Sequence, residues 1–419
     1  MRILYTIGIW FYGFGVHVAA LFGHHNARLM LRGWHHWGEE LKKLDERPVV
    51  WFHAASLGEF EQARPVLESY IDKHPEQQVL LTFFSPSGYE VRKNYSKAQA
   101  VCYLPPDLPI TVRCFTRRIK NLQAVFFVKY DFWFNYLAAL KRLGTPTYIF
   151  SAIFRPNHYF FKWYGAWFRK QLKNCYSHLF VQNEESLRLL REHGVENCTL
   201  AGDTRFDRVH QIAIAAERNE TVERFLAGHE GKVMVCGSTW PPDEQLLAQA
   251  IGQSGNQTIK TIKTILAPHV INEEHLQQIE KLFPDSVRYS SLKDLNDPND
   301  LKGINILIID NIGMLSKLYR YADVAYIGGG FGVGIHNILE AVTFGKPVLF
   351  GPNYGKFQEA RDIIARGGGW SHSNLEELSA HLTPLLTNDD AYRRASQACT
   401  EYMEANLGST DKILNTIEK

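Results

Sequence analysis

The sequence has almost no excess of charge of either sign. Its 419 residues contain 46 Lys and Arg against 44 Asp and Glu, which leaves a formal net charge of +2. A nucleic-acid coat needs strong overall basicity, so this balance argues against a nucleic-acid partner. Any charged partner must instead be met by a local group of side chains.

Motifs for metal and redox chemistry are also missing. The six cysteines are widely spread and form no C-x-x-C pair, and the histidines form no H-E-x-x-H sequence. These absences exclude a zinc knuckle, a dithiol redox motif and a two-histidine metal helix. We therefore expect reduced cysteines, no metal ion and no cofactor.

The chain does have enough apolar sequence for two domains. Apolar residues make up 45% of it, and its length exceeds what one hydrophobic core usually organises. Beyond residue 48, short β-branched or aromatic runs alternate with helical stretches, which is typical of parallel sheets flanked by helices. We expect an α/β fold in which two doubly wound, Rossmann-like domains face each other across a cleft.

The predicted elements divide the chain into four parts. An apolar helix occupies 1–24, one domain 25–208, a linker helix 209–228 and a second domain 229–419, whose last helix would pack back on the first domain. Strands are predicted at 49–54, 79–84, 124–128, 147–151, 179–181, 198–201, 233–236, 262–266, 306–309, 324–327 and 348–350. Helices are predicted at 60–73, 132–143, 243–253, 272–283, 313–321 and 337–344.

The amino terminus is apolar enough to meet a membrane. Residues 5–22 carry no formal charge, a length that is borderline for a bilayer span. Arg2 alone precedes this run, whereas Arg28 and Arg32 follow it, and the positive-inside rule then places the remaining chain in the cytoplasm. No A-x-A cleavage site follows, so we expect a retained anchor or interfacial helix. The alternative is a core helix of a soluble domain.

Acidic residues are absent from one long internal segment. Residues 132–183 contain no Asp or Glu, and Arg155, Lys162, Arg169 and Lys170 lie among many aromatic residues there. Such a strip suits an anionic membrane surface or a phosphorylated amphiphile, because aromatic side chains seat at headgroup level. A solvated helix face with core aromatics behind it is the alternative.

Two motifs could carry chemistry. The run H-A-A-S-L-G-E at 53–59 places Glu59 just beyond a strand's carboxyl end, where open α/β sheets bind ligands; helix capping by Ser56 and Glu59 is the alternative. The run G-G-G-F-G-V-G at 328–334 joins a strand to a helix, and its backbone could approach a phosphate. It spells neither a dinucleotide fingerprint nor a P-loop, and a tight structural turn is its alternative.

The order of the motifs resembles that of a known enzyme family. H-A-A-S-L-G-E near 53, F-W-F-N near 132, A-G-D-T-R-F-D near 201, G-S-T near 237 and G-I-H-N-I-L-E-A-V-T-F-G-K-P near 334 are similar to motifs of the Kdo transferases of lipopolysaccharide synthesis. These inverting GT-B glycosyltransferases move 3-deoxy-D-manno-octulosonic acid (Kdo) from CMP-Kdo onto a lipid A precursor. The resemblance runs over nearly the whole chain.

The resemblance implies roles for individual residues. Glu59 would be the catalytic base, with Ser56 and Gly58 on the acceptor side. Asp131 stands in the family's E-T-E-x-W-P-N segment, where this chain reads K-Y-D-F-W-F-N, and would steer charge at the acceptor. Arg205 replaces the lysine of N-x-K-F-D and would hold the leaving phosphate or the Kdo carboxylate. The cations Arg155, Lys162, Arg169 and Lys170 would serve the acceptor and the membrane.

The donor would be bound in the carboxyl-terminal domain. The implied donor residues are Ser238, Thr239, Pro268, His269, Ile312, Gly313, Met314, Gly329, Gly330, Gly332, Gly334, Asn337, Ile338, Leu339 and Glu340. Glu340 would accept hydrogen bonds from ribose hydroxyls, and the Asn337 end of its helix would face the phosphate.

These implications define one expected function and two alternatives. We expect a transferase that moves Kdo from CMP-Kdo to the glucosamine 6′-hydroxyl of a lipid A precursor (lipid IVA) and releases CMP. It would work at the cytoplasmic face of the cell inner membrane, with the donor, the lipid acceptor and the membrane surface as partners and no obligate protein partner. The alternatives are another GT-B nucleotide-sugar enzyme, either a hexosyltransferase or an epimerase, and a membrane-tethered nucleotide-sugar binding protein without turnover.

Overall fold

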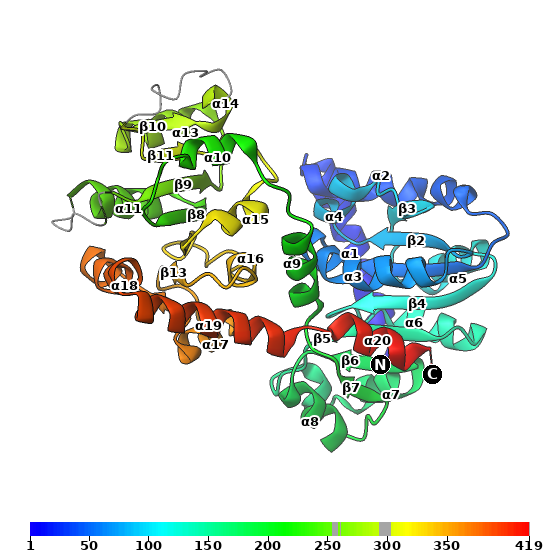
Figure 1. Cartoon of the computed structure of the whole chain (residues 1–419). Coiled ribbons are helices and arrows are strands. Elements are labelled where there is room, and N and C mark those ends of the chain that lie inside the picture. The colour runs from blue at the N-terminus through cyan, green and yellow to red at the C-terminus, as the bar shows by residue number, and fades with distance from the viewer. Residues whose placement is uncertain (254–258, 260, 293–302, 419) are drawn as a thin grey trace. The chain divides into compact units, whose positions relative to one another are not determined.

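The chain folds into two compact units. A computed structural model describes residues 1–253, 259, 261–292 and 303–418 (Figure 1). The amino-terminal unit contains Met1–Arg208 together with Leu407–Lys419, and the second unit contains Val209–Asn406. Each unit has its own parallel sheet.

The amino-terminal unit is built on a seven-stranded parallel sheet of order β3-β2-β1-β4-β5-β6-β7. Its strands are β1 (Val49–Ala54), β2 (Gln78–Phe83), β3 (Ala100–Tyr103), β4 (Leu122–Val128), β5 (Thr147–Ala152), β6 (His178–Val181) and β7 (Cys198–Leu200). Strand β1 pairs with β2 on one side and β4 on the other, so the strand order reverses between β1 and β4. Ligands of doubly wound sheets bind beyond the carboxyl ends of the strands at such a switch point.

Helices cover both faces of this sheet (Figure 1). They are α2 (His25–Glu40), α3 (Leu57–Lys73), α4 (Pro86–Arg92), α5 (Pro109–Arg118), α6 (Phe134–Leu143), α7 (Ala166–Cys175), α8 (Glu184–Glu192) and α20 (Ser409–Ile417). Because side chains alternate along a strand, Val50 and Phe52 of β1 pack on the face covered by α3 and α20, whereas Trp51 packs on the face covered by α5 and α6.

The carboxyl-terminal helix α20 belongs to the amino-terminal unit. The Asp207 carboxylate accepts hydrogen bonds from the N–H groups of Gly408 and Thr410, at 2.8 and 2.7 Å, and from the Thr410 hydroxyl at 2.7 Å. Ile413 and Leu414 are buried in the core beside β1. An acidic side chain that caps free N–H groups fixes where the helix begins.

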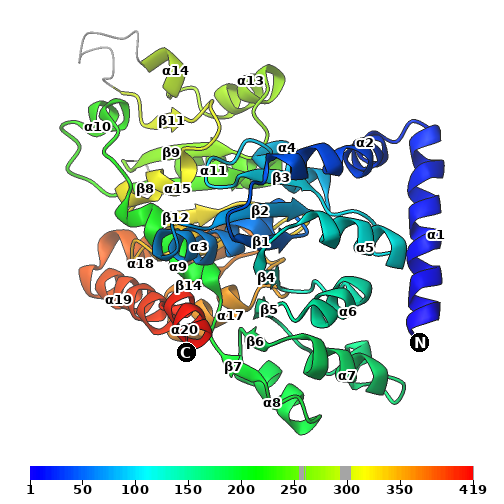
Figure 2. The same cartoon turned by 90° about the vertical axis from the view of Figure 1, so that its right-hand side faces the viewer.

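The first helix, α1 (Arg2–Leu21), lies along the same unit (Figure 2). Val16 and Ala20 are buried against Ala27 and Met30 of α2. Its other face exposes the large apolar side chains of Ile3, Leu4, Ile7, Trp10, Phe11, Phe14 and Leu21. By length and composition the mostly exposed helix α1 could cross a membrane, although core helices of soluble proteins and signal sequences share this length and composition.

The second unit carries a parallel sheet of order β10-β11-β9-β8-β12-β13-β14. Its strands are β8 (Val233–Thr239), β9 (Lys263–Pro268), β10 (Ser286–Arg288), β11 (Ile306–Ile308), β12 (Val324–Ile327), β13 (Val348–Phe350) and β14 (Gly369–Ser371). Its helices include α10 (Glu220–Leu226), α11 (Pro241–Gln253), α13 (Glu273–Leu282), α14 (Tyr289–Leu292), α15 (Leu315–Leu318), α16 (Leu339–Val342), α17 (Gln358–Arg366), α18 (Leu375–Thr387) and α19 (Asp389–Asn406). The switch point lies between β8 and β12.

The predicted α/β class with two doubly wound sheets is confirmed, but several elements differ. The short edge strands β3, β10 and β14 were not predicted; S-V-R of β10 and G-W-S of β14 lack the continuous apolar run that marks the equally short β11 and β13. Residues 209–228 do not form the single predicted linker helix. Helix α9 (Thr204–Ile214) ends at Ile214, and α10 begins after Asn219, whose side chain accepts from the Val222 N–H. The helix predicted at 337–344 is only the one-turn α16.

Candidate active site

The switch point of the amino-terminal sheet brings Glu59 and Asp131 together. Glu59 lies in the first turn of α3 after β1, and Asp131 follows β4, the neighbouring strand. Ser56 caps α3 by accepting from the Glu59 N–H at 3.4 Å, and hydrogen bonds from the backbone of Ala55 and Ser56 to the Glu59 carboxylate lower the pKa of that carboxyl group in part. A Cβ at Gly58 would meet no atom within 4 Å, so packing does not require a glycine there.

Burial makes Glu59 a stronger base than an ordinary glutamate. It raises the pKa of the carboxyl group, while the positive charge of Lys129 lowers it in part. Lys129 follows β4 with a φ of 62°, a left-handed conformation that is uncommon for lysine. Such strained positions cluster at functional sites.

Asp131 is almost fully buried, with 5% of its surface exposed. Burial, and then the nearby charge of Glu59, raise its pKa well above the ordinary value for an aspartate. His53 at the end of β1 places its Nε2 atom 3.7 Å from Asp131 Oδ2. Four buried polar atoms of this cluster have no hydrogen-bond partner among the described residues: Glu59 Oε2, Asp131 Oδ2, His53 Nε2 and Trp133 Nε1. Unsatisfied buried groups are rare in folded proteins, and here they offer contacts for a polar ligand.

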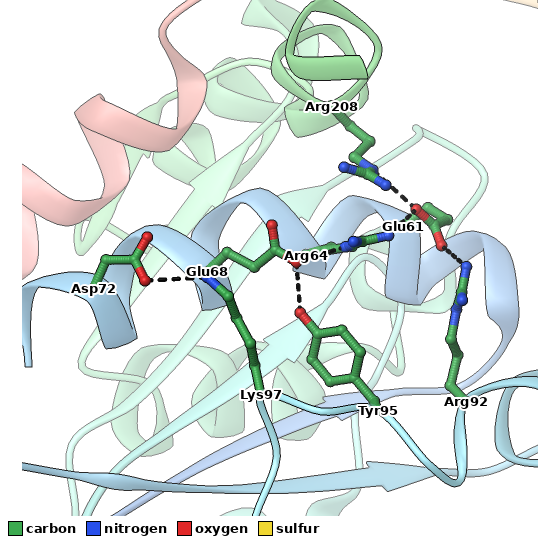
Figure 3. A network of polar contacts seen from close by, with 8 residues as sticks. All are labelled: Glu61, Arg64, Glu68, Asp72, Arg92, Tyr95, Lys97 and Arg208. Atoms are coloured by element: carbon green, nitrogen blue, oxygen red, sulfur yellow. Dashed lines mark hydrogen bonds and ion pairs between the residues drawn. The ribbon is translucent and has the colours of Figure 1, made fainter. Parts of the chain in front are cut away.

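A charge network holds α3 in place one turn beyond Glu59 (Figure 3). Glu61 accepts from Arg92 at 2.8 Å and from Arg208 at 3.0 Å. Further along the helix, Glu68 accepts from Arg64 and from the Tyr95 hydroxyl, each at 2.7 Å. Networked, partly buried pairs restrain a helix more firmly than isolated surface pairs.

Arg205 lies near the same helix, and it is hydrogen-bonded to Asp203. Its Nε donates to Asp203 Oδ2 at 2.8 Å, and its backbone N–H donates to Oδ1 at 2.9 Å. Gln62 of α3 also donates to Asp203, at 3.0 Å. Arg205 is thus held beside α3 through Asp203.

The glycine-rich loop of the second unit uses many of its own N–H groups. Gly329 donates to Asp243 Oδ2 at 2.9 Å, and Gly332 and Gly334 donate to the Gly329 carbonyl at 3.0 and 3.2 Å. This corrects the expectation that these three N–H groups face a phosphate, because the closed turn needs them. A phosphate would meet the remaining N–H groups of the loop, that of Gly330 among them.

Other expected donor residues divide into exposed groups and core groups. Ile338 and Leu339 are completely buried, so only their backbone could meet a ligand, and the four-residue α16 has little dipole to offer at Asn337. Glu340 accepts from the Asn337 side chain at 3.2 Å, which orients its carboxylate. The Thr239 hydroxyl donates to Glu244 at 2.9 Å and is buried.

Two aromatic rings that the sequence reasoning did not predict, those of Trp240 and His336, pack against the expected donor residue His269 beside this loop. His269, at the end of β9, stacks on Trp240 and on His336, with ring centroids 4.7 and 4.5 Å apart. The Trp240 indole N–H donates to His336 Nε2 at 3.2 Å. Burial lowers the pKa of His336, and nearby His269 lowers it further. The only sequence signal for this stack was the position of each ring next to a strand end.

A cavity of about 220 Å³ lies beside the predicted Ile312-Gly313-Met314 turn. Gly313 and Met314 line it, and Asn219, Tyr289 and Tyr321 close its other sides. Gly313 has a φ of 92°, while Ile312 is 90% exposed. A ligand in this cavity could therefore contact both the backbone of the turn and the tyrosines, although the sequence did not indicate those tyrosines.

Comparisons with known proteins agree with the motif order. Residues 35–208 match the family described as "3-Deoxy-D-manno-octulosonic-acid transferase (kdotransferase)". A 3-deoxy-D-manno-octulosonic acid transferase of Chlamydia trachomatis serovar A is 26% identical over 389 residues, which cover 88% of this chain and 86% of that protein. The enzyme of that name from Aquifex aeolicus is 25% identical over 342 residues, or 81% and 86% of the two chains.

The chain is a homologue of the Kdo transferases. The similarity to these Kdo transferases extends through both units, since it covers more than four fifths of the chain. UDP-GlcNAc 2-epimerase from Neisseria meningitidis, solved with UDP-GlcNAc, superimposes with a TM-score of 0.60 over 88% of this chain and 99% of that chain. At 14% identity this neighbour supports the GT-B fold alone.

Proposed function

We propose that this protein transfers Kdo from CMP-Kdo to the glucosamine 6′-hydroxyl of a lipid A precursor and releases CMP. The sequence similarity to Kdo transferases along both units supports the transferase class. The buried, unpartnered Glu59 oxygen at the sheet switch point is the observation that carries the chemistry. No observation of this chain favours an epimerase beyond the shared fold.

Glu59 would act as general base on the acceptor. As the hydroxyl oxygen attacks the anomeric carbon of Kdo, its proton passes to the Glu59 carboxylate and the bond to the CMP phosphate breaks with its electron pair. A raised pKa suits this role, because a base works best when its pKa approaches the working pH. Attack from the face opposite the leaving group inverts the anomeric centre.

The leaving group is a phosphate monoester whose negative charge must be stabilised. The glycine-rich loop and Asn337 to Glu340 of the second unit, with Arg205, are our candidates for this task. The cavity beside Gly313 is the candidate site for the nucleobase. This donor assignment needs no step through a metal ion.

Helix α1 and the cationic strip, formed by Arg155, Lys162, Arg169 and Lys170, would bring the enzyme to a lipid substrate. Arg2 donates to the Asn135 side chain of α6 at 2.8 Å, and the far end of α1 packs on α2. Because both ends of α1 contact the unit, α1 suits a position in the membrane interface better than a span. Tyr5 contacts Phe134, which contacts Trp167 beside the cationic strip, so the two membrane features adjoin.

One experiment tests this function directly. Purified full-length protein is incubated with CMP-Kdo and a tetra-acylated lipid A precursor, and the lipid product is weighed by mass spectrometry. We expect a mass increase of one or more Kdo units together with release of CMP, and none with Glu59→Gln. Transfer from a hexose nucleotide instead, or conversion of UDP-GlcNAc without any lipid product, would contradict the proposal.

A further inference from the structure

Three buried side chains, those of Trp51, Thr82 and His53, form a series of contacts that ends at Asp131. Trp51 Nε1 donates to the Thr82 hydroxyl at 2.7 Å, and that hydroxyl lies 2.8 Å from His53 Nδ1. His53 and Thr82 are register partners on adjacent strands, and none of the three side chains is exposed to solvent. His53 Nε2 then faces Asp131 Oδ2 at 3.7 Å.

The tautomer of His53 depends on its contacts with Thr82. The Thr82 oxygen already accepts from Trp51, and its own proton has two acceptors: His53 Nδ1 at 2.8 Å and the Phe52 carbonyl at 3.5 Å. The Thr82 hydroxyl can therefore donate to Nδ1 at the shorter distance, while a hydrogen bond between the ring and the Thr82 backbone raises the pKa of His53 in part. A neutral imidazole that accepts at Nδ1 carries its proton on Nε2, which points to Asp131.

The remaining contacts leave that proton for Asp131 alone. Neither His53 Nε2 nor Asp131 Oδ2 has another hydrogen-bond partner among the described residues. Burial lowers the pKa of His53 to about 3, so the ring donates a proton in a hydrogen bond without carrying charge. The Tyr176 hydroxyl donates to the Asp131 carbonyl at 2.7 Å and fixes the backbone, and the Trp133 side chain lies close enough to the carboxylate to lower the pKa of Asp131 in part.

We propose that Trp51, Thr82 and His53 form a directed hydrogen-bond relay that orients the Asp131 carboxylate beside Glu59. This inference rests on the proposed function. His53 is a positioning residue: its Nε2–H shortens to a hydrogen bond with Asp131 when the acceptor binds, as catalytic contacts often do. Such a hydrogen bond would counteract the rise in the pKa of Asp131 that burial and the charge of Glu59 cause, and a negative charge on Asp131 would in turn favour a basic Glu59.

The relay predicts a definite change in the pH dependence of transfer. A hydrogen bond from Nε2–H stabilises the ionised carboxylate, so its loss raises the pKa of Asp131 further. Glu59 and Asp131 titrate as a pair, and the acid limb of the kcat/KM profile reports that pair. Losing the relay should therefore move the acid limb to higher pH by about one unit, the size expected for a hydrogen bond to a charged group.

Matched variants separate the relay from simple packing. His53→Asn keeps an amide near the Nδ1 position and loses the donor at Nε2, whereas His53→Gln places an amide donor near Nε2. Thr82→Val removes the hydroxyl that sets the tautomer, and Thr82→Ser retains it. We expect the acid limb to shift in His53→Asn and Thr82→Val, and to stay near the wild-type position in His53→Gln and Thr82→Ser. Thermal unfolding of each variant checks that the fold is retained.

A second measurement does not depend on activity. Imidazole ¹⁵N shifts of the full chain, with His53→Asn used for assignment, should show His53 protonated at Nε2 in the wild type and a changed tautomer in Thr82→Val. A wild-type His53 protonated at Nδ1, or folded His53→Asn enzyme with an unshifted acid limb, would overturn the relay. Absence of Kdo transfer by wild-type protein with the expected tautomer would contradict the proposed function and leave the relay geometry standing.

Discussion

The Tyr5 hydroxyl donates a 2.6 Å hydrogen bond to the buried carboxylate of Asp107 and so ties the apolar helix α1 to the amino-terminal unit. The same carboxylate accepts from the N–H groups of Asn135 and Tyr136 at 3.0 and 2.9 Å, in the first turn of α6. Burial raises the pKa of Asp107 to about 6, and these hydrogen bonds limit the rise.

This carboxylate should make stability depend on pH. Because the pKa of Asp107 is higher in the folded state than in the unfolded state, its stabilising contribution is complete below about pH 4 and is lost as the pH rises through about 6. A shift of about two units corresponds to about 3 kcal/mol. Unfolding by denaturant across pH 4–7 should show this loss in the wild type and not in Asp107→Asn. Tyr5→Phe should move the loss to higher pH, and identical pH profiles for all three proteins would exclude the assignment.

Replacing Glu59 by Gln should lower kcat by about 10²-fold or more, the usual contribution of a general base. The fold should persist, because the Ser56 cap accepts from the backbone of residue 59 and a glutamine side chain can still accept from the Ala55 and Ser56 backbone. CMP affinity, measured by calorimetry, should be unchanged. In the wild type, activity should fall as the pH drops through a pKa above the ordinary value of 4.5. Near-normal turnover of Glu59→Gln would show that Glu59 has a structural role and is not the base.

The glycine-rich loop offers a matched pair of alanine variants. A Cβ at Gly332 would lie 3.8 Å from its nearest neighbour, the Gly329 carbonyl oxygen, whereas a Cβ at Gly330 would lie 2.6 Å from the Gly351 backbone. Gly332→Ala should therefore weaken CMP binding with little change in melting temperature, and Gly330→Ala should lower both. Unchanged CMP affinity in Gly332→Ala and in Glu340→Ala would rule out a phosphate and ribose site at this loop.

The apolar face of α1 can be tested without disturbing its packed face. Substituting exposed Leu4, Phe11 and Phe14 by Ser should leave a protein that binds anionic vesicles at low salt and is released as salt rises. The wild type should stay bound. The control is Ile214→Ser, because Ile214 is an exposed apolar residue of the second unit.

The cationic strip should supply the salt-sensitive part of that binding. Changing Arg155, Lys162 and Lys170 to Gln in the Ser-substituted protein should abolish vesicle binding and raise the KM for the lipid acceptor, but not that for CMP-Kdo. Arg169 is left intact because it donates to the Phe160 carbonyl at 2.6 Å and supports the local fold. Retention of vesicle binding in the combined variant would show that other surfaces hold the membrane.

Local sequence was enough to predict the α/β class and many strands. β1 was predicted with its observed ends because V-V-W-F-H-A is a short β-branched and aromatic run, and the structure buries it throughout. The edge strands β3, β10 and β14 were not predicted; S-V-R and G-W-S carry little apolar signal, whereas the equally short I-L-I of β11 and V-L-F of β13 were recognised. The apolar character of α1 was likewise visible in the sequence, whereas its packing along α2 and α6 depended on Tyr5, Val16 and Ala20 finding partners far along the chain.

The composition of the candidate site followed from sequence, but its connections came from tertiary structure. Glu59 and Asp131 could each be placed after a strand, yet only the pairing of β1 with β4 makes them neighbours. Similarly, the tautomer of His53 depends on Thr82, which the β1–β2 register sets beside it. The pattern of successive apolar and polar residues determines where a strand ends, because that pattern is local to the chain. The chemistry of a side chain at a strand end depends on its burial and its hydrogen-bond partners, and folding alone brings those partners together.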